Sequence, residues 1–379
     1  MTISKSYKLF ILIFFFYISP LVSSLLVLIF YSLKNKKDDL IFLFLPIAGF
    51  LALLNANKIF VSDVVGYYNI FEQAYNFQFL DYMKKFSKTT QPILYIFNYI
   101  IHYLMDFSPR AYVFIVTFVP YLILFFSIKK ILDKSNLENS FYFIILLSIM
   151  ISPLIFQLSG HLIRQFFSFS LLFLAISMDN RLSMVFFYII SLLTHAMSII
   201  FFPIIFFIFF RKKINNYNPN LIFGVVLICI LIIFALLFFD NYYLQRWRSL
   251  FLDTQIMVRS VGIGYKILTV LSIIFCIINF FKKKNYFEFI FSNFNLVIYI
   301  FIFYSLFSLS LNKISIRYAM YLYVSLPIII FISVKDIYVK YINIINLIIL
   351  LLFLFIFYIY IEKFSNFEYN ILQTLTLIS

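Results

Sequence analysis

The side chains of this sequence that could do chemistry are concentrated in one stretch, residues 157–203: QLSGHLIRQFFSFSLLFLAISMDNRLSMVFFYIISLLTHAMSIIFFP. Four polar residues open an otherwise apolar run at spacings of three and four: His161, Arg164, Gln165 and Ser168. Because residues three and four apart are neighbours on a helix, we expect them on one helix face. An arginine and a histidine at the edge of a membrane span are costly unless they meet a partner or a ligand. The stretch therefore predicts the floor of an active site that faces away from the cytoplasm.

A second group of polar residues interrupts the later apolar run of the same stretch: Thr194, His195 and Ser198. The run 182–210 is too long for one helix and too short for two full spans. We therefore expect two half-depth helices that meet at a turn near His195, below the membrane surface. A buried histidine can simply donate to a neighbouring carbonyl, but ionisable residues inside a membrane are functional by default. We interpret His195 as a functional residue.

Arginines and lysines at the outer ends of the expected spans form a third group, because they contradict the preference of these residues for cytoplasmic loops. Lys58 and Lys313 are expected to extend to the phospholipid head groups. The arginines are expected to converge, since guanidinium groups bind phosphate in bidentate fashion. The predicted ligand is an anionic, membrane-embedded molecule presented from outside. The arginines of this group are Arg164, Arg246, Arg248, Arg259 and Arg317.

Asp63 is the acidic counterpart of these cations. It lies in SDVVGYY, and Tyr67 follows four residues later, so the carboxylate and the ring are expected on one helix face. A carboxylate beside aromatic rings suits the hydroxyl groups of a sugar. The alternative is a charge at a helix N-terminus, because Ser62 and Asp63 also form a typical capping pair. The sequence leaves these two interpretations open.

The elements that must position these residues are membrane helices. The chain has 379 residues, of which 64% are hydrophobic and 12% are charged, so a soluble domain is excluded. Apolar runs near the roughly 20 residues that cross a bilayer recur from end to end. We predict an all-α, polytopic integral membrane helical bundle with roughly 10–13 transmembrane helices, some of them short or re-entrant. The whole chain, 1–379, is expected to form a single transmembrane domain.

Charge and run length predict how these helices are arranged. The net charge of +15 lies mostly in lysine and arginine clusters of cytoplasmic loops, so no nucleic-acid partner is expected. The run 7–33 is either one long tilted helix or a helix kinked at Pro20. The segment 55–90 and the loop 240–262 are expected outside, where they contribute to an outward-facing cavity. The run 91–105 is expected to enter the membrane without crossing it; the alternative is that one orientation is assigned wrongly.

No nucleotide-binding loop, metal-binding motif or nucleophile motif occurs in the sequence. No acidic pair at close spacing indicates a dedicated metal site. Cys229 and Cys276 lie in the middle of apolar runs and are interpreted as small packing residues. We therefore expect chemistry without metal or cofactor.

Several motifs, in this order, resemble the EpsG-like family of Wzy-type polysaccharide polymerases. They are SDVVGYYNIFEQ, TTQPILYIF, HLIRQFFSFSLLFLA, MDNR, LLTHAMSIIFFP and IRYAMYLY. The resemblance covers Asn55 to Pro203 well and the last third of the chain loosely. Two positions depart from the family pattern: Gln91 stands where many relatives have Glu, and Lys58 where Arg is usual.

The resemblance implies a glycosyltransferase in the cytoplasmic (inner) membrane that crosses it many times, with its active site outward. It would join oligosaccharide repeat units carried on undecaprenyl pyrophosphate, among membrane lipids and beside flippase and chain-length regulator proteins. Asp63, Arg164 and His195 would be catalytic, with Asp63 or His195 as the base for the acceptor hydroxyl. The residues expected to bind substrate are His161, Gln165, Tyr67, Arg246, Arg248, Arg259 and Arg317.

Two other functions fit a cationic outward cavity. A flippase or transporter of lipid-linked oligosaccharide would usually show internal repeats, and none is visible. An O-antigen-ligase-like enzyme or a glycosyltransferase that uses single lipid-linked sugars would be favoured by a large outer loop, and the loop 240–262 is small.

Overall fold

The computed structural model of the chain describes residues 5–24, 26, 40–58, 63–87, 92–103, 108–134, 153–202, 205, 209, 270 and 274. The chain divides into two compact units, Met1–Met197 with Val339–Ser379, and Ser198–Tyr338. The regular elements of the described residues are all helical. This confirms the all-α class over that part of the chain, and the site described below lies within the first unit.

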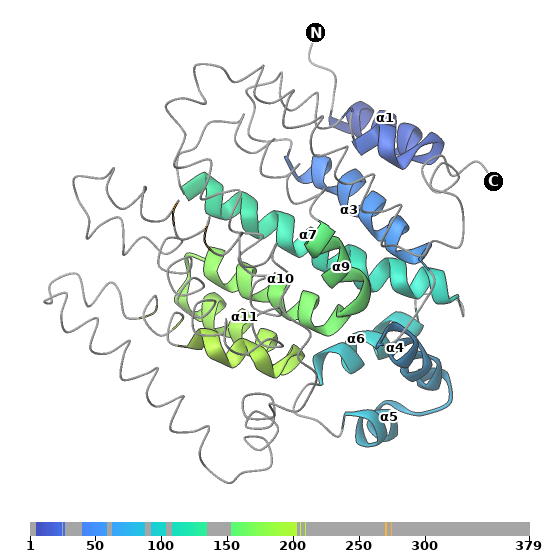
Figure 1. Ribbon diagram of the computed structural model, residues 1–379, viewed down its shortest axis with the longest axis vertical. Helices are drawn as coiled ribbons and strands as arrows, with labels where there is room; N and C mark the ends of the chain where they lie inside the picture. Colours follow the sequence, from blue (N-terminus) through green and yellow to red (C-terminus); the bar gives the residue numbers. More distant parts are fainter. Residues whose placement is uncertain are drawn as a thin grey trace, which may run out of the picture. The chain divides into compact units, whose positions relative to one another are not determined.

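Four apolar helices of the first unit pack side by side in the order α3, α7, α10 and α11 (Figure 1). Their bounds are Leu40–Ala56, Pro109–Lys134, Ile163–Ser177 and Arg181–Thr194. Because α10 lies between α7 and α11, every residue of α10 is buried except Arg164. Arg164 is therefore the one partly exposed residue of this central helix.

Helix α7 is the longest of these helices. Pro109 is its first residue, where a missing N–H costs nothing, and the Ser108 hydroxyl accepts a hydrogen bond from the Ala111 N–H at 3.4 Å. Within the described residues, Pro109–Ile131 is the one helix that is long and apolar enough to cross a bilayer. The shorter apolar helices are Phe44–Ala56, Ile93–His102, Ile163–Ser177 and Arg181–Thr194.

Helices α10 and α11 are joined by a reciprocal pair of serine hydrogen bonds. Ser168 Oγ donates to the Ser191 carbonyl at 2.8 Å, and Ser191 Oγ donates to the Ser168 carbonyl at 2.8 Å. Asn180 caps the N-terminus of α11 by accepting a hydrogen bond from the Leu182 N–H at 3.0 Å, as the polar break there suggests. At the other end of α11 the chain leaves the α-helix at His195 and continues as a 3₁₀ helix, η3 (Ala196–Phe201). The predicted interruption near His195 is confirmed, while the half-depth placement of the two helices in the membrane stays a prediction.

The segment 55–90 holds short helices: α4 (Asp63–Glu72), η2 (Gln73–Tyr75) and α5 (Phe79–Phe86). Among its described residues there is no span, as predicted. The next helix, α6 (Ile93–His102), has 10 residues and a length of about 15 Å, half the thickness of the bilayer core. That length agrees with the prediction that this run does not cross.

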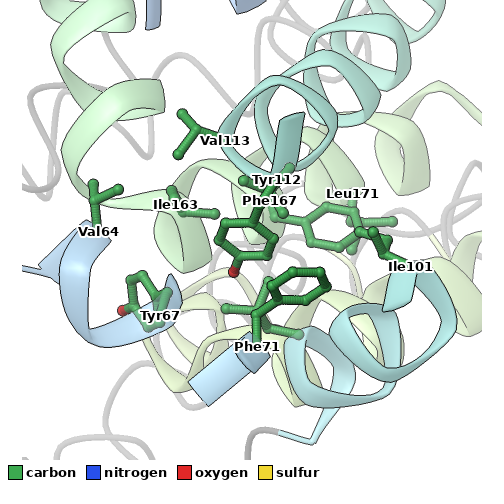
Figure 2. Close-up of a cluster of buried hydrophobic side chains, with 11 residues drawn as sticks. Val64, Tyr67, Phe71, Ile101, Tyr112, Val113, Ile163, Phe167 and Leu171 are labelled. Atoms are coloured by element: carbon green, nitrogen blue, oxygen red, sulfur yellow. The ribbon is translucent and has the colours of Figure 1, made fainter. Parts of the chain in front are cut away.

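A cluster of buried apolar side chains fixes α4 against the long helices (Figure 2). It joins Phe71 of α4 to Tyr112 of α7, whose rings are stacked with centroids 4.6 Å apart. Ile163 and Phe167 of α10 lie in the same cluster. Stacked pairs of this kind contribute about 1 kcal/mol beyond their burial. Helix α4 is therefore held to α7 and to the beginning of α10.

The N-terminal run breaks at Ser19 and Pro20. Helix α1 covers Lys5–Ile18, and the Ser19 hydroxyl then accepts a hydrogen bond from the Val22 N–H at 3.3 Å. Proline removes one helical hydrogen bond and its ring clashes with the preceding turn, so the chain restarts with Ser19 as a cap. The helix is thus interrupted at Ser19, which favours the kinked alternative over the described part of this run.

One helical prediction is wrong. His161, Arg164, Gln165 and Ser168 do not share a helix, because α9 (Pro153–His161) ends at His161 and α10 begins at Ile163. Leu162 between them has φ −115° and ψ 57°, outside the helical region. The break follows Gly160, where the backbone is approached closely by side chains from α3, as described below.

Candidate functional site

Arg164 and Tyr67 connect the two stretches that the sequence singles out. Arg164 Nε donates a hydrogen bond of 2.6 Å to the Tyr67 hydroxyl, and the guanidinium carbon lies 5.1 Å from the centre of the Tyr67 ring. Arg164 is in the first turn of α10, and Tyr67 is buried on α4. Burial raises the pKa of the Tyr67 hydroxyl, and Arg164 partly opposes this effect. The contact fixes the guanidinium plane in one orientation.

Asp63 is the first residue of α4 and lies exposed, one helical turn before Tyr67. A carboxylate in the first turn of a helix is favoured by the helix dipole, which agrees with the capping interpretation. Its charge also acts on the site, because it raises the pKa of both Tyr67 and His161. The carboxylate of Asp63 therefore stabilises the N-terminus of α4 and also acts electrostatically on Tyr67 and His161.

Lys58 follows α3 and is only 6% exposed, so the prediction that it extends to the head groups is wrong. Its Nζ donates a hydrogen bond of 2.9 Å to Asn55 Oδ1 and lies 3.4 Å from the centre of the Phe156 ring. Asn55 Nδ2 in turn donates to Ser159 Oγ at 2.8 Å. These contacts hold the amine against α9 instead of at the surface.

Gly160 makes this burial possible. A Cβ at Gly160 would lie 2.5 Å from Asn55 Oδ1 and 2.8 Å from Lys58 Nζ, closer than real Cβ contacts. Only a residue without a side chain lets α9 pass the amide and the amine at this distance. Tyr121 of α7 completes the network with a hydrogen bond of 2.8 Å between its hydroxyl and Ser159 Oγ. Helices α3, α7 and α9 are thereby fixed around the amine.

His161 lies at the end of α9 and is partly buried. Burial is the largest cause that lowers the pKa of its imidazole below the usual 6.5, and the charge of Lys58 lowers it further. Asp63 acts in the opposite direction. At neutral pH the imidazole is therefore uncharged and can accept a proton.

His195 lies at the same end of the α10–α11 pair as Arg164. The serine bonds place Ser168 opposite Ser191, and Arg164 and His195 each lie four residues beyond that contact. Because the connection between the helices is short, they run antiparallel, and both rise about 1.5 Å per residue. Arg164 and His195 are therefore level, about 6 Å beyond the serine contact.

The structure thus places five of the predicted site residues at the Arg164 end of α10, and Lys58 joins them. The five are Asp63, Tyr67, His161, Arg164 and His195. Gln165 is 2% exposed and belongs to the interior of α10. The predictions for the remaining arginines and for the loop 240–262 lie outside the described residues: Arg246, Arg248, Arg259 and Arg317.

The residues that sequence reasoning missed are those that hold Lys58: Asn55, Ser159 and Tyr121. A weak signal was present, since Asn55 and Lys58 are spaced by three at the end of an apolar run, and Ser159 and Gly160 are small residues beside a histidine. Small residues are typical of close helix contacts in membranes.

Chemically, the arrangement offers charge and a choice of proton acceptors. A guanidinium held by a tyrosine hydroxyl presents a planar, forked donor of the kind that binds phosphate oxygens. An exposed carboxylate and an uncharged imidazole lie in the same cluster, and either can accept a proton. This combination suits a reaction in which an anionic group departs while a hydroxyl group loses a proton.

Comparison with known proteins supports one family. None of the curated proteins and none of the solved structures matches the chain significantly. The model of the EpsG family matches residues 40–373, which include all the residues of the cluster and most of the chain. The chain therefore belongs to the EpsG family.

Proposed function

We propose that this protein polymerises oligosaccharide repeat units carried on undecaprenyl pyrophosphate, at the outer side of the cytoplasmic membrane. Membership of the EpsG family makes it a membrane protein of polysaccharide biosynthesis. The observation that carries the proposal is the Arg164–Tyr67 contact, since it presents a fixed guanidinium at the one partly exposed position of α10. Such a group suits the diphosphate of a lipid-linked sugar.

The reaction consists of one substitution at the anomeric carbon of the growing chain. The bond from that carbon to the diphosphate oxygen breaks, and a bond to the acceptor hydroxyl oxygen forms. Arg164 stabilises the negative charge that develops on the departing diphosphate. The proton of the acceptor hydroxyl passes to a base, and the proposed base is Asp63 because it is exposed where a hydrophilic acceptor arrives. His195, level with Arg164, then belongs to the donor side of the site.

The ends of α10 support the outward orientation. Arg164 lies at the beginning of α10. Met178 lies just after the end of α10, and its Sδ accepts a hydrogen bond of 3.5 Å from Lys130 Nζ. Lys129, Lys130 and Lys134 form a cluster that the positive-inside rule assigns to the cytoplasm. This arrangement supports an outward position for the Arg164 end of the helix.

Labelling of introduced cysteines tests this orientation. A cysteine at Asn180 is expected to react with a membrane-impermeant reagent only after the cytoplasmic side is opened, and one at Ser62 in intact cells. The reverse pattern would contradict the outward site.

The lipid-linked intermediates of a deletion strain test the function. A strain without the protein is expected to accumulate single repeat units on the lipid at the outer face, and the wild-type gene to restore long chains. Intermediates that stay at the cytoplasmic face would indicate a flippase instead. Single sugars or finished chains that remain on the lipid would indicate a different transferase or a ligase.

Arg164→Lys tests the role of the guanidinium. The substitution keeps the charge but removes the forked donor, so chain elongation is expected to fall by 10-fold or more, on the order of 1.4–3 kcal/mol of lost charge-assisted hydrogen bonding. Arg181→Lys is the matched control, since Arg181 opens α11 at the opposite end of the helix pair from Arg164. Normal chain length with Arg164→Lys at normal protein levels would refute the role of Arg164.

A further inference from the structure

Lys58 lies buried in a niche with specific contacts, and the proposed reaction gives this residue no role. Within the described part of the chain, Asn55 Oδ1 is its one hydrogen-bond partner, at 2.9 Å, and its other close contact is the Phe156 ring. An ammonium group has three donors, so a charged Lys58 would be poorly satisfied here. Buried charges of this kind are costly unless they are paired. Among the described residues, the niche therefore holds an amine without an anionic partner.

Within the described part of the chain, charged and polar groups from four helices surround the Lys58 niche. The charge of Lys58 lowers the pKa of the His161 imidazole on α9, and the carboxylate of Asp63 on α4 raises it. Arg164 of α10 follows Gly160 by four residues, across the break at Leu162, and the Tyr121 hydroxyl of α7 bonds to Ser159 in the same network. Lys58 is thus a second basic residue of the site, and it contacts α9, on the other side of the helix break from Arg164.

We propose that Lys58 is a further anion-binding residue of this site. Its amine takes up a proton and becomes charged when a phosphate group binds beside it. The inference rests on the proposed function, because the anion is the diphosphate of the lipid-linked substrate. In this step one proton from the solvent joins the amine, –NH₂ becomes –NH₃⁺, and no bond of the substrate breaks. Substrate binding then carries a proton into the site.

Burial supports this coupling. It lowers the pKa of Lys58 from 10.5 to about 7, so at pH 8 most of the amine is uncharged while the site is empty. A phosphate group beside the amine favours the charged form and restores the proton. The two cations then act differently: Arg164 is always charged, whereas Lys58 becomes charged only with an anion in place.

Calorimetric titration of the purified full-length protein with farnesyl diphosphate tests the proposal, with farnesol as the uncharged control. Titrations at pH 8 in two buffers of different ionisation enthalpy give the number of protons taken up per ligand. For the wild-type protein the expected uptake is close to one proton. For Lys58→Arg the expected uptake is close to zero with binding retained, because arginine is charged before the ligand arrives. For Lys58→Met the affinity is expected to fall about 10- to 100-fold.

The outcomes separate Lys58 from its neighbour and from the function. If the Lys58→Arg variant still takes up a full proton, the proton belongs to His161 and the proposal is overturned. Wild-type affinity of the Lys58→Met variant would also overturn it. If arginine does not fit the niche, the pH dependence decides: wild-type affinity falls between pH 7 and pH 9, and that of Lys58→Met does not. Wild-type protein that ignores farnesyl diphosphate would refute both the inference and the diphosphate role. Wild-type protein that binds it but never elongates a lipid-linked repeat unit would refute the polymerase alone.

Discussion

Replacing Lys58 by methionine is expected to change how stability depends on pH. Burial lowers the pKa of this amine from 10.5 to about 7, which costs the folded state about 5 kcal/mol when the amine is charged. The unfolded chain keeps the proton up to its own pKa near 10.5, while the folded chain releases it near 7. The free energy of unfolding therefore rises with pH between these values, by about 2 kcal/mol from pH 7 to pH 9.

Methionine has a similar length and no charge, so it removes this pH-dependent part. It also leaves Asn55 Oδ1 without its donor, which costs about 1 kcal/mol at every pH. At pH 7, Lys58→Met is therefore expected to be more stable than the wild-type protein by about 3 kcal/mol, and at pH 9 by about 1 kcal/mol.

The assay is thermal unfolding in detergent at pH 7, 8 and 9, expressed as the difference between the two proteins so that other titrating groups cancel. Lys58→Arg, which keeps a permanent charge in the niche, is the control and should be the least stable at pH 9. A methionine variant that is less stable than wild type by the same amount at every pH would refute the reasoning. It would mean that Lys58 is charged and well paired in the empty site.

Two further substitutions test the site. Gly160→Ala is expected to reduce elongation strongly, since its Cβ would lie 2.8 Å from the buried amine, whereas Gly66→Ala adds a Cβ with nothing within 4 Å and should leave elongation unchanged; equal effects of the two on chain length would contradict the close packing. Asp63→Asn keeps the shape of the side chain and removes its charge, so at normal protein levels it should abolish elongation while farnesyl diphosphate still binds. A wild-type elongation rate with Asp63→Asn, together with an inactive His195→Ala, would reverse the assignment of the base.

The sequence predicts the parts of the site that follow from local pattern. The interruption at His195 and the choice of Arg164 as a site residue follow from polar residues that interrupt apolar runs. Tyr67 was chosen for its spacing of four from Asp63, and its contact with Arg164 was not predicted. The burial of Lys58 was not predictable in this way, because its niche is made by residues about 100 positions away in the chain. The helix break at Leu162 was not predicted either, because the polar residues around it are spaced by three and four as in a continuous helix.

The break at Leu162 divides the site between two mechanical parts. The hydrogen bonds between Ser168 and Ser191 join α10 to α11, so Arg164 moves together with these two helices. His161 ends α9 and travels instead with the network that holds α9 to α3. No continuous helix crosses the joint, so rotation there costs less than rotation anywhere within α10. A diphosphate held by cations on both sides would act as a bridge across the joint, and its departure would let the two parts separate.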